Sequence, residues 1–196
     1  MIDRTDPAIE FVKHLVWLND ERNHDPHRRG ELAALRRGLG KEPGQAPEMH
    51  QYVVPFLPDR VDEAHERAYY LVAALFAWHP ENWASSDPWR TNLGASFAQI
   101  ADRSSSVERR FMALLSCDAE RLPYHLRQAI GLLRAKDVPV NWRLLIEDLQ
   151  HWDDPARIVQ RRWARSFWGV RRPDGQTPEP SPKGEAEHTA TEGVQE

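Results

Sequence analysis

Arginine side chains gather near the C-terminal end of this sequence in a pattern suited to binding phosphate. Between residues 157 and 172 there is no acidic residue, and six arginines occur: Arg157, Arg161, Arg162, Arg165, Arg171 and Arg172. The planar guanidinium group can engage two phosphate oxygens at once. Trp163, Phe167 and Trp168 stand among them, and an aromatic ring beside a cation can stack an unpaired base, a contact worth roughly 1–3 kcal/mol. The segment therefore favours contact with a nucleic acid.

The same segment has the periodicity of an amphipathic helix. On a wheel of 100° per residue, Val159, Trp163 and Phe167 lie on one side, whereas Arg161 and Arg165 lie on the other with further arginines. This predicts a core face backed by an arginine face. The competing interpretation is a solvated charged face whose last arginines complement the helix dipole. For Trp168, packing is the favoured interpretation and base stacking the alternative.

Other basic residues add to this pattern. The segment from residue 28 to residue 41 has five cations against the single acid Glu31. Arg127 and Arg134 are seven residues apart and share one helix face. The full set of candidate nucleic-acid-binding residues is Arg28, Arg29, Arg36, Arg37, Lys41, Arg109, Arg110, Arg127, Arg134, Lys136, Arg157, Arg161, Arg162 and Arg165.

The net charge hides these clusters. The chain of 196 residues carries 26 basic and 30 acidic residues. Residues 173–196 hold one lysine, six acids, four prolines and hardly any aliphatic side chain, a composition typical of a disordered tail. Without that segment, residues 1–172 have 25 basic and 24 acidic residues. We therefore expect one helical domain over 1–172 and a proline-rich acidic tail over 173–196.

Catalytic patterns are weak by comparison. The segment from His65 begins like a zinc-protease helix but has Tyr69 where the second histidine is required, and no P-loop is present. The single cysteine, Cys117, excludes an internal disulfide and a cysteine-based zinc site. Scattered acids leave one alternative open, a helical metal-dependent hydrolase: Asp102, Asp118, Asp137, Glu147, Asp148, Asp153 and Asp154. The favoured prediction is a binding protein without catalytic residues, cofactor or metal.

Helical periodicity positions these side chains almost throughout. Start signals such as Asp6-Pro7, Asn92 and Asp154-Pro155, together with apolar residues three and four apart, predict helices over residues 7–21, 26–37, 47–54, 61–78, 92–100, 141–152 and 154–170. Two more helices are expected to begin at Ser105 and at Pro123. No segment alternates like a strand between hairpin turns. The expected fold is all-α, a single compact bundle of about eight or nine helices. The start of the chain lacks a signal-peptide pattern and no apolar run approaches the ~18 residues of a membrane span, which predicts a cytoplasmic protein.

Several segments, in order, resemble one known family. The family is CasB, the small subunit of the type I-E CRISPR surveillance complex, Cascade. The similarity runs from about residue 8 to 170, leaves the tail outside, and is carried by residues 28–37 (RRGELAALRR), 109–115 (RRFMALL), 132–134 (LLR), 141–142 (NW), 148–152 (DLQHW) and 162–168 (RWARSFW).

The resemblance implies an all-helical protein with no activity of its own. It implies partners: the guide crRNA, both strands of the target DNA, the large and backbone subunits of Cascade, and a second copy of the chain, with no membrane. Members of the family help to hold the R-loop open. Because guide pairing reads the target sequence, such a subunit needs to recognise backbone and shape only. The alternative is a scaffold whose basic patches contact acidic surfaces of partner proteins.

Overall fold

Helices joined by short connections make up the computed structural model. It describes residues 6–20, 26–83, 85, 87–101 and 105–169. In this part of the chain the helices are α1 (Pro7–Leu18), α2 (Pro26–Arg36), η1 (Pro47–Met49), α3 (His50–Val53), η2 (Val54–Phe56), α4 (Glu63–Trp78), α5 (Leu93–Ile100), α6 (Ser105–Ser116), α7 (Leu122–Arg134), α8 (Trp142–Gln150) and α9 (Ile158–Trp168).

The all-α prediction is confirmed for the described residues. Their only β pairing is an isolated bridge between Asn82 and Val140. The predicted tail over 173–196 lies outside the described residues.

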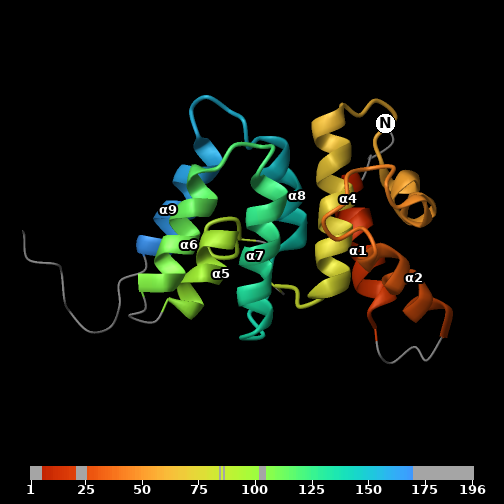
Figure 1. Cartoon of the computed structure of the whole chain (residues 1–196), viewed down its shortest axis with the longest axis horizontal. Coiled ribbons are helices and arrows are strands. Elements are labelled where there is room, and N and C mark those ends of the chain that lie inside the picture. Colours follow the sequence, from red (N-terminus) through yellow and green to blue (C-terminus); the bar gives the residue numbers. More distant parts are fainter. Residues whose placement is uncertain (1–5, 21–25, 84, 86, 102–104, 170–196) are drawn as a thin grey trace, which may run out of the picture.

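The helices form two groups that share one core. Figure 1 shows α1, α2 and α4 on one side of the molecule, α5, α6, α7 and α9 on the other, and α8 between them. Helix α4 packs on α2 and α8, α5 packs on α9, and α6 packs on α7. Buried apolar side chains form one continuous cluster that extends from Ala8 in α1 to Phe167 in α9. The exposed faces of α7 and α9 are therefore mounted on a single packed body.

Side-chain caps fix where several helices begin. The carboxylate of Asp6 accepts a hydrogen bond from Ala8 N (2.9 Å), and the amide oxygen of Asn92 accepts one from Ala95 N (3.2 Å). Asn141 caps α8 in the same way. Each of these side chains satisfies a backbone N–H that has no partner inside its helix. These helix starts match the sequence prediction to within a residue.

Helix α9 is the exception, because it begins later than predicted. Asp154 closes a turn instead of capping a long helix: its carboxylate accepts from Ala156 N (2.7 Å) and its carbonyl from Arg157 N (2.8 Å). Arg157 then adopts a left-handed backbone with φ of 52°, and the helix starts at Ile158. The predicted start at Asp154-Pro155 is therefore wrong by about one turn.

The connection after α4 ties the two groups together. The indole N–H of Trp142 donates to Glu81 O (3.0 Å), and Val140 N donates to the same carbonyl (3.1 Å). His79 is buried and its Nε2 lies 2.8 Å from Val138 O. Within the described part of the chain, no helix is both long and apolar enough to cross a bilayer.

Candidate nucleic-acid interface

Two candidate cations of α2 donate hydrogen bonds to backbone carbonyls of neighbouring helices. Arg28 is buried, donates to Trp17 O (3.0 Å) and lies 3.5 Å above the Trp17 ring. Arg36 donates through both Nε (2.9 Å) and Nη2 (2.7 Å) to Ala77 O at the end of α4. Both guanidinium groups therefore hold helices together. Arg28, a candidate nucleic-acid ligand by sequence, is thus buried, and the guanidinium group of Arg36 donates twice to one backbone carbonyl.

Two arginines of the last basic segment are committed in the same way. Arg157 donates through Nη2 to Leu115 O and lies 6.0 Å from the ring centroid of Trp152. Arg162 pairs with the carboxylate of Asp148, which is buried. Burial lowers the pKa of Arg162 from its ordinary value, and Glu147 opposes that shift. Arg157, which was predicted to lie on the arginine face, and its neighbour in the segment, Arg162, therefore both serve internal contacts.

The rest of that face forms an exposed stripe along α9. Arg161, Arg165 and Trp168 follow each other at spacings of four and three, so they lie on one side of the helix. Both arginines are exposed, and among the described residues neither side chain makes a hydrogen bond or ion pair. We call these three residues the α9 stripe.

Trp168 both packs and faces solvent. Its ring lies 5.7 Å from Phe111 and 4.8 Å from Phe167, and its indole N–H donates to Glu108 Oε1 (3.0 Å). It nevertheless remains 47% exposed. The packing interpretation is confirmed, and the exposed part of a firmly held ring is free to contact a ligand.

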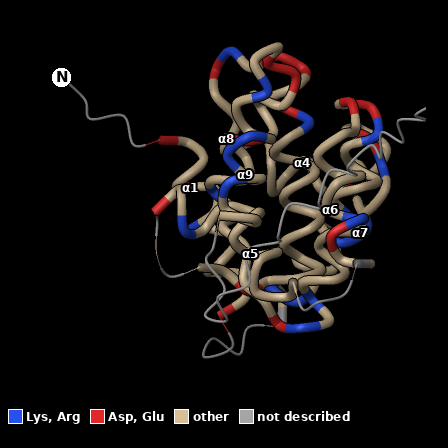
Figure 2. Tube along the Cα trace, turned by 90° about the vertical axis from the view of Figure 1, so that its left-hand side faces the viewer, with Lys and Arg blue, Asp and Glu red and all other residues tan. Residues whose placement is uncertain are grey.

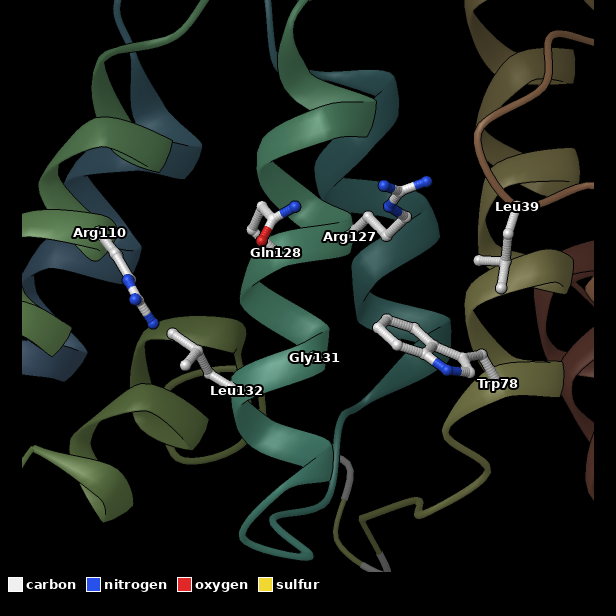
Figure 3. A pocket seen from close by; sticks show the side chains of 7 residues that line it. All are labelled: Leu39, Trp78, Arg110, Arg127, Gln128, Gly131 and Leu132. Carbon is white, nitrogen blue, oxygen red and sulfur yellow. The ribbon is translucent and has the colours of Figure 1, made fainter.

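A groove over α7 brings together cations from two helices. Its volume is about 440 Å³ and its lining is Leu39, Trp78, Arg110, Arg127, Gln128, Gly131 and Leu132. Figure 3 shows Arg110 extending from α6 toward Leu132 on one side of α7, and Arg127 near Trp78 on the other. Both arginines are exposed, and no described residue pairs with either side chain. We call this set the α7 groove.

Gly131 lets the ring of Trp78 pack closely against α7 in the lining of the groove. A Cβ at Gly131 would lie 3.0 Å from the Trp78 ring, so the indole packs directly against the α7 backbone. Arg134, one turn further along, places its guanidinium carbon 5.3 Å from the centroid of the same ring. The spacing of Arg127 and Arg134 predicted their shared face. Trp78, Leu39, Gln128 and Leu132 were missed, because their convergence depends on how α4 and the end of α2 pack beside α7.

The other candidate cations are exposed but dispersed. Arg37 lies 3.9 Å from Glu48, which is a weak contact at an exposed site. Exposed positions are also occupied by Arg29, Lys41, Arg109 and Lys136. Figure 2 shows the basic segments of α9 and of α6 as separate blue patches. The described part of the chain therefore offers two cationic surfaces, the α9 stripe and the α7 groove.

Cys117 and Asp118, two of the residues considered for catalysis, have structural roles, and Asp102 lies outside the described residues. Cys117 is buried and donates to Leu114 O (3.1 Å), and burial raises its pKa to about 11. A thiol with that pKa is protonated at neutral pH, so it is a poor nucleophile. Asp118 caps the start of the next turn by accepting from Arg121 N (2.9 Å). Among the described residues, no three His, Cys, Asp or Glu side chains gather as metal ligands would.

Comparison with known proteins identifies relatives across most of the chain. The family model of the CRISPR-associated protein Cse2 matches residues 31–168. A CRISPR-associated protein Cse2 of Thermus thermophilus is 40% identical over 165 residues, 84% of this chain and 91% of the relative. The crystal structure of CasB from Thermus thermophilus has a TM-score of 0.69 at 33% identity and covers 84% of this chain and 99% of its own. A chain of a solved CRISPR RNA-guided surveillance complex has a TM-score of 0.66 at 33% identity, with 82% and 91% covered.

Proposed function

The chain belongs to the Cse2 family of CRISPR-associated proteins, and we propose that it is the small subunit of a Cascade-type surveillance complex, in which it binds nucleic-acid backbone and stabilises the opened target. The family assignment confirms the resemblance to CasB that the ordered sequence segments indicated. Its proposed partners are the other subunits of that complex, the guide RNA, both target DNA strands and a second copy of the chain.

One observation carries the nucleic-acid part of this proposal. Arg161 and Arg165 stand one turn apart on a rigid helix, with no internal partner among the described residues, beside the exposed ring of Trp168. A cation without an internal partner attracts a polyanion without first giving up an internal contact. The surfaces have few groups suited to reading base edges, which fits a complex in which the guide reads the sequence.

The two cationic surfaces suit different nucleic-acid partners. A displaced single strand exposes unpaired bases that can stack on Trp168 while its phosphates meet Arg161 and Arg165. A guide–target duplex presents mainly phosphate and sugar, which suits the arginines of the α7 groove. We therefore assign the displaced strand to the α9 stripe and the duplex backbone to the α7 groove. The subunit acts by binding alone, with no catalytic step of its own.

Reconstitution of the whole complex tests this function. The test variant is Arg161→Glu with Arg165→Glu. The matched control is Arg90→Glu with Arg121→Glu, which makes the same change in net charge at exposed arginines lying near their own local acids. Target unwinding is followed by fluorescence of a base analogue in the target duplex. We expect the test variant to enter the complex normally and to open the target less, whereas the control opens it like the wild type.

The scaffold alternative makes the opposite prediction. If these arginines contact acidic surfaces of partner proteins, the test variant is lost from the purified complex. Unwinding by complexes that retain the variant would then be unchanged. Normal retention with normal unwinding at moderate salt would contradict the assignment of the α9 stripe to nucleic acid.

A further inference from the structure

Residues 173–196 begin a few residues after the helix that carries the α9 stripe, and they have the opposite net charge. This segment holds six acids and one lysine, and the match to the family model ends at residue 168. The described chain ends at Gly169, one residue after Trp168. A strongly acidic segment therefore begins within a few residues of a cationic surface that has no internal partner among the described residues.

We propose that the acidic segment 173–196 binds the α9 stripe of its own chain and so competes with nucleic acid for Arg161 and Arg165. The inference rests on the proposed function for its consequence, because competition matters only if the stripe binds a strand. The segment supplies carboxylates, which accept hydrogen bonds from guanidinium groups in the geometry that phosphate oxygens use. It would act as an internal polyanion on the stripe. A small anion that binds weakly would not displace it, whereas a long strand with many phosphates would.

The covalent connection makes this competition effective. Residues 170–196 number 27, and an extended chain spans at most about 3.3–3.6 Å per residue, or roughly 90 Å, so every acid in the segment has enough chain to reach the stripe. A short connection also keeps a linked ligand at an effective concentration in the millimolar range. At that effective concentration, even weak contacts between a few carboxylates and the two arginines are formed for much of the time.

The choice of the α9 stripe follows from which cations have no partner. Arg157 and Arg162 on the same helix are held by Leu115 O and by Asp148, and Arg36 is held by Ala77 O. Arg161 and Arg165 make no such contact among the described residues, and of the described arginines Arg165 lies nearest in sequence to the acids. The arginines of the α7 groove are equally unpartnered within the described chain, but they stand on α6 and α7 and not on α9.

The first arm of the test measures affinity of the full-length chain for a fluorescent oligothymidine at low salt. The tail-neutral variant keeps the chain length and carries Asp174→Asn, Glu179→Gln, Glu185→Gln, Glu187→Gln, Glu192→Gln and Glu196→Gln. We expect its affinity to rise about tenfold, which corresponds to a stripe that the tail covers about nine-tenths of the time. The gain should shrink as salt is added, because screening weakens the internal contact.

A double-mutant cycle locates the contact on the stripe. Combining the tail-neutral changes with Arg161→Gln and Arg165→Gln should abolish most of the gain, because the tail then has lost its docking residues. The same cycle with Arg110→Gln and Arg127→Gln should leave the gain intact. A gain that persists in full after the stripe is neutralised would overturn the docking site.

The second arm needs no nucleic acid. A tryptophan-quenched dye is attached at Ala186→Cys, and the buried Cys117 reacts little with the label. Docking brings the dye near Trp168, so the dye should brighten on adding salt, on neutralising the tail, on Arg161→Gln with Arg165→Gln, and on Trp168→Phe. Brightness that none of these changes affects would overturn the proposal. If no variant binds a strand at any salt concentration, the proposed function fails, and the dye still decides whether the tail docks.

Discussion

Replacing Gly94 by alanine tests the packing that holds α9 in place. Gly94 lies in α5, where this helix crosses α9, and a Cβ at this position would lie 2.0 Å from Trp163 O and 2.7 Å from Trp163 C. The neighbour is helix backbone, so it cannot rotate away as a flexible side chain could. The hydrogen bond from Asn92 Nδ2 to Ser166 Oγ (2.7 Å) fixes the two helices at the same level.

The magnitude follows from the geometry. Ordinary contact begins at 3.4 Å, so the added Cβ and Trp163 O must move 1.4 Å further apart to reach it. Overpacking of this kind typically costs about 1–3 kcal/mol, and alanine returns at most about 1 kcal/mol through its better helix propensity. Because the clash is with backbone, we expect a net loss near the upper limit, about 2–3 kcal/mol. Urea unfolding of the two proteins measures the difference in free energy of unfolding.

Gly30 provides the matched control. It also lies in a helix, α2, but a Cβ there would meet nothing within 4 Å. Gly30→Ala should therefore stabilise the protein by about 0.5–1 kcal/mol, because alanine loses less backbone entropy on folding. The same substitution should thus have opposite signs at the two sites. If Gly94→Ala unfolds at the same or a higher urea concentration than the wild type, the close approach of α5 and α9 described here is wrong.

Three further predictions concern polar groups that are buried or half-buried. Asp148→Ala should lower the free energy of unfolding by about 3 kcal/mol. The substitution leaves Arg162 without its carboxylate partner and the indole N–H of Trp163 without the acceptor that lies 2.6 Å away. A loss under about 1 kcal/mol, measured by urea unfolding, would contradict this. Burial lowers the pKa of His14 from its ordinary value of 6.5, and the charge of Glu31 opposes this shift. Because the unfolded chain then binds the proton more readily, the stability that is present above pH 6.5 should be lost as the pH falls below that value. His14→Gln should flatten that part of the curve of stability against pH. Since burial raises the pKa of Cys117 to about 11, a thiol reagent at about pH 8 should label the native protein far more slowly than the urea-unfolded one, and equal labelling rates would show that the thiol is accessible.

Local signals predicted most of the fold correctly. Asp6 and Asn92 each cap the helix that the sequence assigned to them, because a short polar side chain next to an apolar periodic segment satisfies backbone groups only a few residues away. The inner face of α9 was also correct: Val159, Trp163 and Phe167 are buried. These features depend on interactions within one turn, so a single sequence contains the information needed to predict them.

The start of α9 could not be predicted in this way. Asp154-Pro155 has the sequence of a helix start, but the left-handed backbone of Arg157 interrupts it. The side chain of Arg157 then reaches Leu115 O, 42 residues earlier, and stands near Trp152. A tertiary contact thus decides a local boundary that capping signals alone place one turn too early.

The candidate interface shows the same limit. Four arginines proposed as nucleic-acid ligands have internal acceptors at sequence distances of 11, 41, 42 and 14 residues: Arg28, Arg36, Arg157 and Arg162. No pattern within their own helices distinguishes them from Arg161 or Arg165. Composition therefore indicated the basic helices, while the division into structural and unpartnered arginines requires the packed fold.

Salt dependence of single-strand binding tests the central claim most directly. The affinity of the full-length chain for oligothymidine is measured over a range of salt concentrations for the wild type, for Arg161→Gln with Arg165→Gln, and for the control Arg90→Gln with Arg121→Gln. If the unpartnered arginines of the α9 stripe each neutralise a phosphate, the slope of log K against log salt should fall by roughly 0.7 per arginine, about 1.4 in total, and the control slope should not change. Identical slopes for the wild type and the stripe variant would contradict the account.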